Sequence, residues 1–148
     1  MYKLTKDILE FVLSGNINFT VVSKKTGTKL KLRIERALKS FSSAVEPPWF
    51  IHAVPLEGGT NYKYVSFIKL HKATQAFIYS AGKYSKIKLG SETEKAVRHV
   101  MIALLTKKET LSFDVYYKGT CRVCGRTLTD PDSIERGCGP TCYKKTIV

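Results

Sequence analysis

Four cysteines are the residues whose type and spacing point most directly to chemistry. Cys121 and Cys124 are separated by two residues, and Cys138 and Cys142 are spaced like neighbours on one turn of a helix. Two thiolates at a CxxC turn can bind one metal ion, and four thiolates form a closed tetrahedral zinc site with no open position for water or substrate. We therefore predict a structural zinc ion (Zn2+) that stabilises the fold and takes no part in catalysis.

Two other interpretations of these cysteines stay open. They could be reduced thiols in a core, although isolated buried cysteines do not cluster as CxxC and CxxxC. Cys121 and Cys124 could be a redox pair, although the surrounding sequence does not predict a βαβ unit. The first residues, up to Asp7, have no apolar signal core, and no run is long enough to span a bilayer. We expect a cytoplasmic protein without membrane contact, in a compartment that keeps thiols reduced.

The cysteine segment also resembles a known motif. The run from Cys121 to Cys142, CRVCGRTLTDPDSIERGCGPTC, is similar to the pattern CxxCGRxLTxPxSIxxGxGPxC of an uncharacterised family of small phage and bacterial proteins. Weaker similarity lies in Phe19–Ile34 and Trp49–Leu70. The resemblance implies a phage or mobile-element origin and a zinc-binding end, and it implies no activity.

This chain departs from that family pattern at one position. The resemblance implies an apolar residue where Cys138 stands, and a histidine before the first cysteine as the remaining ligand; here Tyr117 is near that place. The resemblance therefore supports Cys121, Cys124 and Cys142 as ligands, whereas Cys138 rests on its spacing alone.

The charge of the chain is the second informative feature. Its 148 residues include 25 Lys and Arg against 12 Asp and Glu, a net charge of +13. Such an excess attracts polyanions and steers encounter with them, with nucleic acid the usual partner, an anionic membrane surface second and an acidic protein third. A high charge can also serve solubility alone.

The basic residues gather in two stretches that also carry aromatic rings. Residues 58–91 contain no acid, and residues 24–39 contain a single Glu35 among seven cations. Cations follow a phosphate backbone and aromatic faces stack on unpaired bases, so we predict a single-strand nucleic-acid interface. The residues assigned to it are Lys29, Lys31, Arg33, Lys63, Lys69, Lys86, Lys88, Tyr62, Tyr64 and Tyr84. We assign Trp49, Phe67 and Phe77 to the core, and lysines on an outer strand face can also be ordinary solvated residues.

Hydrophobic periodicity predicts an α+β fold with a small, largely antiparallel sheet and about two helices. Alternation predicts strands over 16–22, 29–34, 49–54, 62–70, 76–80 and 113–117, with a hairpin turn at 24–27. Helices are predicted after a Thr5 cap and after the capping box formed by Ser91 and Glu94. We expect residues 1–113 to form a basic α+β domain and residues 114–148 a treble-clef-like or ribbon-like zinc module.

The sequence predicts binding rather than catalysis. His52, His71 and His99 are scattered, and the chain has no P-loop or dinucleotide fingerprint. We expect a small basic zinc-containing protein that binds nucleic acid, with single-stranded DNA or RNA preferred. The alternative is a phage interaction protein that inhibits a host enzyme or defence factor through its basic surface.

Overall fold

The protein folds around one antiparallel sheet. The computed structural model describes residues 2–117, 121, 123–124 and 138–139. Seven strands lie in the order β1-β7-β2-β3-β4-β5-β6, and every neighbouring pair is antiparallel. The strands are β1 (Tyr2–Leu4), β2 (Ile17–Ser23), β3 (Lys29–Arg36), β4 (Trp49–Ala53), β5 (Lys63–Leu70), β6 (Phe77–Ala81) and β7 (Phe113–Tyr117).

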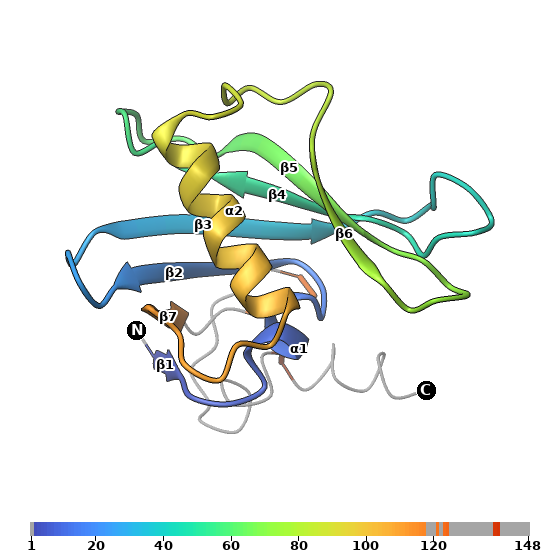
Figure 1. Ribbon diagram of the computed structural model, residues 1–148, viewed down its shortest axis with the longest axis horizontal. Helices are drawn as coiled ribbons and strands as arrows, with labels where there is room; N and C mark the ends of the chain where they lie inside the picture. The colour runs from blue at the N-terminus through green and yellow to red at the C-terminus, as the bar shows by residue number, and fades with distance from the viewer. Residues whose placement is uncertain (1, 118–120, 122, 125–137, 140–148) are drawn as a thin grey trace.

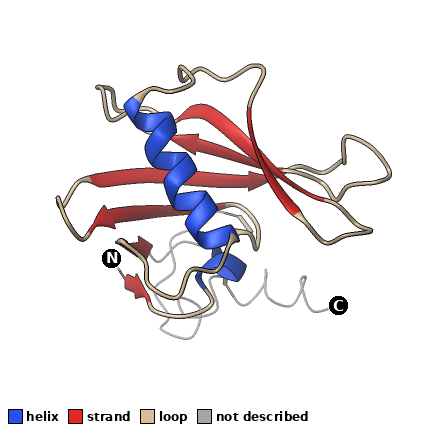
Figure 2. Cartoon of the chain, viewed as in Figure 1, coloured by secondary structure: helices blue, strands red, loops and turns tan. Residues whose placement is uncertain are grey.

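Two helices complete the described fold, α1 (Ile8–Val12) and α2 (Glu92–Leu105). In Figure 1, α2 crosses the strands on the side of the sheet nearest the viewer, with α1 near its C-terminal end. Figure 2 shows the same arrangement of one helical layer against one sheet. The predicted α+β class and antiparallel sheet are confirmed.

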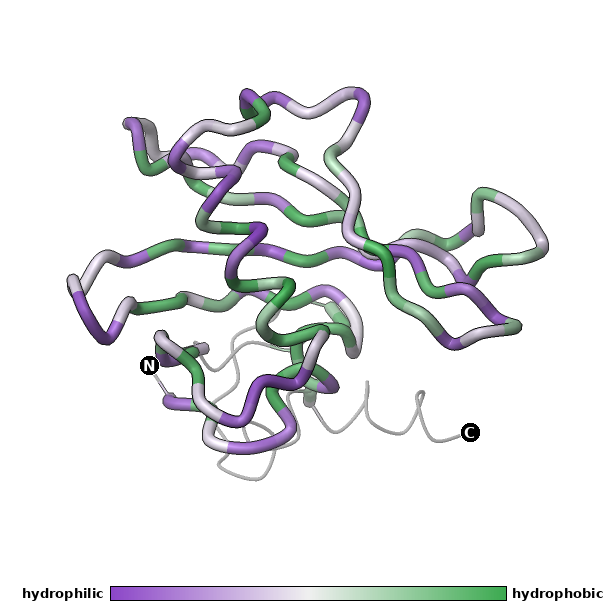
Figure 3. Tube along the Cα trace, viewed as in Figure 1, coloured by the Kyte–Doolittle hydropathy of each residue, from purple (hydrophilic) through white to green (hydrophobic). Residues whose placement is uncertain are grey.

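Alternation along the strands divides the sheet into two faces. On β3, Leu30, Leu32 and Ile34 are buried, while Lys29 and Lys31, which alternate with them, are exposed. The alternation of polar and apolar residues is visible along this strand in Figure 3. We call the face with the buried residues the inner face and the opposite one the outer face.

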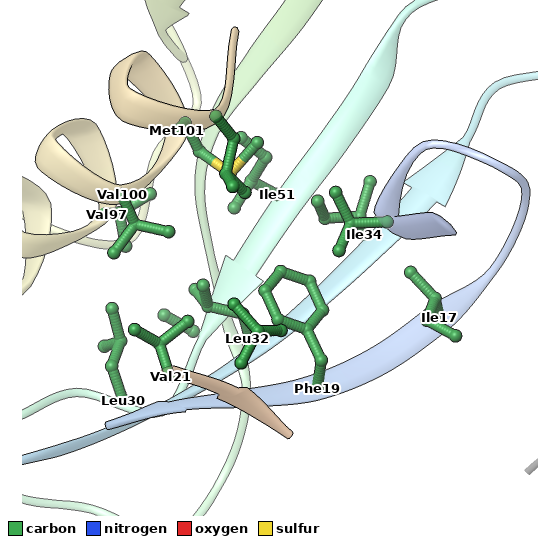
Figure 4. Close-up of a cluster of buried hydrophobic side chains, with 14 of the residues drawn as sticks. Ile17, Phe19, Val21, Leu30, Leu32, Ile34, Ile51, Val97, Val100 and Met101 are labelled. Carbon is green, nitrogen blue, oxygen red and sulfur yellow. The ribbon is translucent and has the colours of Figure 1, made fainter. Parts of the chain in front are cut away.

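The inner face packs against α2 to form the core. Val97, Val100 and Met101 project from α2 toward strand residues that include Leu32 and Ile51 (Figure 4). Each of these side chains is at most 4% exposed, and burying such a side chain contributes about 1.5–3 kcal/mol. The sheet is thus held to α2 through one face.

A polar cluster fixes the N-terminus of α2. The Ser91 hydroxyl accepts from the Glu94 backbone N–H at 3.2 Å, as the predicted capping box requires. Glu57, from the loop after β4, accepts from the Thr93 backbone N–H and hydroxyl, both at 2.7 Å. Glu94 is 1% exposed and pairs with Arg98, and its carboxylate also accepts from the Gly90 N–H. These bonds satisfy donors that a helix start leaves without intrahelical partners.

A bulge in β5 changes which of its side chains face outward. Ile51 lies opposite Ser66, whereas the next residue of β4, His52, lies opposite Tyr64, so Val65 is the extra residue. Both Val65 and Ser66 are buried. Because a bulge breaks the two-residue alternation, Tyr64 and Phe67 lie on the same face although they are three residues apart.

The structure corrects the sequence-based description at two places. The N-cap of α1 is Asp7, with a positive φ of 52°, rather than Thr5. The three-residue β1 was not predicted; it pairs with β7 at the edge of the sheet. β7 lies between β1 and β2 in the sheet, and the division into residues 1–113 and 114–148 stays a prediction. The predicted treble-clef or ribbon geometry falls mostly outside the described residues.

The cap at Glu57 predicts a pH dependence of stability. Its hydrogen bonds to the Thr93 side chain and backbone lower the pKa of Glu57 below its ordinary value of 4.5. A carboxyl whose pKa is lower in the folded state than in the unfolded state stabilises the fold at pH values above its unfolded-state pKa. This contribution is lost as the pH falls through the folded-state pKa. Glu57→Gln should therefore lower the free energy of unfolding at neutral pH, by a difference that shrinks as pH falls from neutrality through the lowered pKa of Glu57. Urea unfolding across this range measures it.

Glu92→Gln is the matched control. Glu92 also lies in the first turn of α2, but among the described residues its carboxylate makes no hydrogen bond or ion pair. A loss of stability in Glu57→Gln that stays constant with pH would contradict the assignment of Glu57 as an ionised cap.

Candidate nucleic-acid interface

The outer face carries a row of polar and aromatic side chains across three strands. Arg33 of β3 lies opposite His52 of β4, which in turn lies opposite Tyr64 of β5. The His52 and Tyr64 rings are 5.6 Å apart, centroid to centroid. Directly opposite residues in an antiparallel sheet are close enough for their side chains to touch, so the row is set by strand register.

Aromatic rings form a second row beside the first. Phe50 of β4 lies opposite Phe67 of β5, and Phe41 from the β3–β4 loop stands edge-on against both, at 6.4 and 5.3 Å. Phe50 also meets the Tyr64 ring edge-on at 5.8 Å. Phe41 is 58% exposed. We call the rings of Phe41, Phe50, Tyr64 and Phe67 the aromatic platform.

Arg33 lies at the edge of this platform with two partners. Its guanidinium carbon is 4.8 Å from the centre of the Tyr62 ring, and its Nε is 3.2 Å from Glu35 Oε1. The Nε is buried, yet it makes no hydrogen bond of good geometry. The cation is thus oriented by a ring and a carboxylate, and its side chain remains 37% exposed.

Burial controls the protonation of the groups beside Arg33. Burial lowers the pKa of His52, as does Arg33, against an opposing effect of Glu35, so the imidazole is uncharged at neutral pH. Burial also raises the pKa of Tyr62 and of Tyr64. At neutral pH both phenols therefore keep the proton that they can donate.

The structure brings part of the predicted interface together. Lys29, Lys31 and Arg33 share the outer face of β3, as their alternation predicts. Lys69 lies opposite Ile78, on the same side as Phe67. Tyr62 contacts Arg33, and Tyr64 belongs to the platform.

Other predicted residues lie elsewhere. Lys63 is opposite Ala53, a buried inner-face residue, so the bulge places Lys63 and Lys69 on opposite sides despite their even spacing. Tyr84, Lys86 and Lys88 lie in the loop after β6, and all three side chains are exposed. This loop is tied to the start of β5, because the Lys86 N–H donates to the Tyr64 carbonyl at 2.9 Å.

Sequence reasoning missed several residues of the outer face. Phe67, assigned to the core, lies on the outer face because of the bulge, whereas Trp49 is buried as expected. Phe77 packs partly buried against the core. The sequence analysis did not assign Phe41, Phe50 or His52 to the outer face. For Phe50 and His52 the alternation with Trp49, Ile51 and Ala53 along β4 could have predicted it.

In the described part of the cysteine segment, several backbone N–H groups lie close to the Cys121 sulfur. Cys121 and Cys138 are buried, and Cys124 is exposed. Although burial opposes ionisation, backbone N–H groups of Cys124, Gly139 and Val123 directed at the thiol lower the pKa of Cys121 to about 6. The contact from Gly139 brings the second half of the motif next to the first. A sulfur surrounded by N–H donors has the thiolate character of a metal ligand, so this donor set fits zinc.

The fourth predicted ligand, Cys142, lies outside the described residues. Among the residues that are described, no three His, Cys, Asp or Glu side chains gather closely enough to hold a metal ion.

One serine–histidine contact lies on the opposite side of the molecule. His99 Nε2 is 3.0 Å from Ser112 Oγ, at a small cavity of about 160 Å³ lined by residues of α2, β2 and β3. The other described contact of His99 is an edge-on approach to the Phe113 ring. A nucleophile–base pair needs a third group to orient the base, and in the described part of the chain no carboxylate does so.

These features define an α+β protein with a cysteine-rich C-terminal segment and an outer sheet face that neither described helix covers (Figure 1). A model of a family of unknown function, DUF6011, matches residues 113–146, which begin with β7 and include all four cysteines. No curated protein and no solved structure matches the chain. None of the described helices is long and apolar enough to cross a membrane.

Gly82 gives a test of the geometry of the platform. A Cβ added at residue 82 would lie 2.5 Å from the Tyr64 ring, so the ring rests directly on this glycine. Gly82→Ala should displace Tyr64 from Phe50 and His52 and lower the free energy of unfolding by about 1–3 kcal/mol, the usual cost of overpacking. Denaturant unfolding measures the loss, and the NMR signals of the His52 ring report the movement of Tyr64.

The matched variant is Gly82→Ala combined with Tyr64→Ala, which removes the obstructing ring. If Tyr64 blocks the new methyl group, the double variant should lose less stability than the two single losses added together. Strictly additive losses would contradict the close contact.

Proposed function

We propose that the protein binds single-stranded nucleic acid on the outer face of its sheet. The observation that carries the proposal is the joining of Arg33, Lys31 and the aromatic platform on one face that no described helix covers. The cations contact phosphates, and the rings supply stacking surfaces for bases.

The aromatic rings favour single strands over duplexes. A duplex keeps its base faces stacked inside, whereas an unpaired base can leave the strand and stack on a side chain. Within the aromatic platform Phe41 is the exposed ring, at 58%, and it makes edge-on contacts with Phe50 and Phe67. The net charge of +13 adds attraction that does not depend on sequence.

We also propose that Cys121, Cys124, Cys138 and Cys142 hold one structural zinc ion and that the protein performs no catalysis. The directed N–H groups around the Cys121 sulfur and the nearness of Gly139 support a metal-binding turn. Because the family match starts at Phe113, the metal would fix a segment that continues directly from β7 in the sheet.

A second candidate function is binding to an acidic host protein, as an inhibitor encoded by a phage. The loop between β3 and β4 favours it, since Leu38 is 98% exposed and Phe41 is 58% exposed in that loop. Exposed apolar side chains of this kind are typical anchors of protein contacts.

Charge reversal on β3 tests the nucleic-acid proposal. Lys31→Glu with Arg33→Glu should weaken binding to a short oligothymidylate and flatten the slope of log affinity against log salt by about one to two units, because about 0.7 counterion is released per phosphate contact on a single strand. Fluorescence anisotropy at several salt concentrations measures both quantities.

The matched control reverses two charges on the helical side, Lys95→Glu with Lys108→Glu, which makes the same change in net charge. If both double variants weaken binding equally, or if the β3 variant stays folded and binds like the wild type, the outer face is not the interface. That result would favour the second candidate function, binding to an acidic host protein.

Zinc removal tests the second proposal. The purified protein should contain about one zinc ion per chain, and a chelator should unfold the C-terminal segment, since metal binding supplies folding free energy to so small a unit. Elemental analysis and limited proteolysis measure the two effects. Cys124→Ser should abolish zinc binding, whereas Cys138→Ser distinguishes a four-cysteine site from the three-cysteine pattern. Metal-free protein with an unchanged thermal transition would contradict the proposal.

A further inference from the structure

One acidic side chain lies in the middle of the outer face. Glu35 is the sole acid in the strands β3, β4 and β5, whose outer face carries the cations Lys29, Lys31, Arg33 and Lys69. On a surface that attracts phosphates, a carboxylate opposes binding of the backbone. The position of Glu35 among these cations therefore indicates a role other than contact with phosphate.

The contacts of Glu35 leave its oxygens partly free. Oε1 is 3.2 Å from Arg33 Nε, and Oε2 is 3.7 Å from His52 Nε2, which is too long for a hydrogen bond. The Glu35 side chain is 44% exposed. An ionised carboxylate has about four acceptor positions, so most of them remain available to a ligand.

The strand register places this carboxylate beside the aromatic platform. Glu35 lies directly opposite Phe50, and the exposed Phe41 ring stands against Phe50. A base stacked on these rings would therefore present its edge toward the Glu35 side of the platform. Arg33 of the neighbouring row pairs with the carboxylate at 3.2 Å.

We propose that Glu35 is a specificity-determining residue that selects an unpaired guanine; this inference rests on the proposed nucleic-acid function. Guanine presents two adjacent donors on its Watson–Crick edge, N1–H and the exocyclic N2–H, which match the two oxygens of one carboxylate. Adenine and cytosine place an acceptor beside their amino donor, and thymine or uracil flanks its N3–H with two carbonyls. An ionised carboxylate only accepts hydrogen bonds, so the acceptor atoms on the adenine, cytosine, thymine and uracil edges repel one of its oxygens. The guanine edge is open only in a single strand.

The test compares oligothymidylates of about nine nucleotides, a length within the range that one binding module covers, with a central thymine, guanine or hypoxanthine base. Hypoxanthine keeps N1–H and lacks the exocyclic amino group. The wild type should bind the guanine oligonucleotide about tenfold more tightly than the thymine one, within the range of a bidentate base contact, and the hypoxanthine one less tightly than guanine. Glu35→Gln should bring this ratio close to one.

Glu46→Gln is the matched control, because Glu46 pairs with Arg36 at 3.7 Å and lies in the loop before β4. It should keep the guanine preference. If the wild type fails to bind the all-thymine strand at low salt, the proposed function itself fails. If that strand binds but guanine gives no gain, or if Glu35→Gln keeps the gain, the role of Glu35 is overturned while the proposed function stands.

Discussion

The packing of α2 against one face of the sheet is the interaction on which the rest of the structure depends. Val97 and Met101 are fully buried against strand residues such as Leu32 and Ile51, which supply the apolar contact of β3 and β4. Because side chains alternate along a strand, burying one face fixes which side chains lie on the other. The outer face is therefore a consequence of the core, and the positions of Lys31 and Arg33 follow from those of Leu32 and Ile34.

The bulge in β5 modifies this rule beside the aromatic platform. With strict alternation from Tyr64, the next outward residues would be Ser66 and Ile68, and Phe67 would enter the core. With Val65 as an extra residue, Phe67 faces outward opposite Phe50, and Ser66 is buried. The platform thus gains a ring because the strand is irregular, and Gly82 leaves room for the Tyr64 ring beside it. Bulges often redirect a side chain in this manner near functional sites.

Much of the fold could be predicted because its strongest signals are local. The alternation in β3, the hairpin glycine at Gly27 with its positive φ of 74°, and the capping of α2 by Ser91 each lie within a few residues of sequence. The bulge could not be predicted, since nothing in the run from Lys63 to Leu70 distinguishes an extra residue from regular alternation. Glu57 as a cap of α2, and β1 as a partner of β7, depend on contacts between distant segments. For the same reason the sequence indicated which cations of β3 share the outer face, but not that the Phe67 ring lies there too.

We propose that the outer face, and not the helical face, receives a single-stranded nucleic acid. Titration of isotope-labelled protein with a short oligothymidylate, followed by NMR, tests it most directly because backbone amide signals report where the ligand lies. We expect the largest shifts at Arg33, His52, Tyr64 and Phe67, and small shifts along the exposed side of α2, such as at Lys95. Shifts concentrated on α2, or spread evenly over all basic residues, would contradict it.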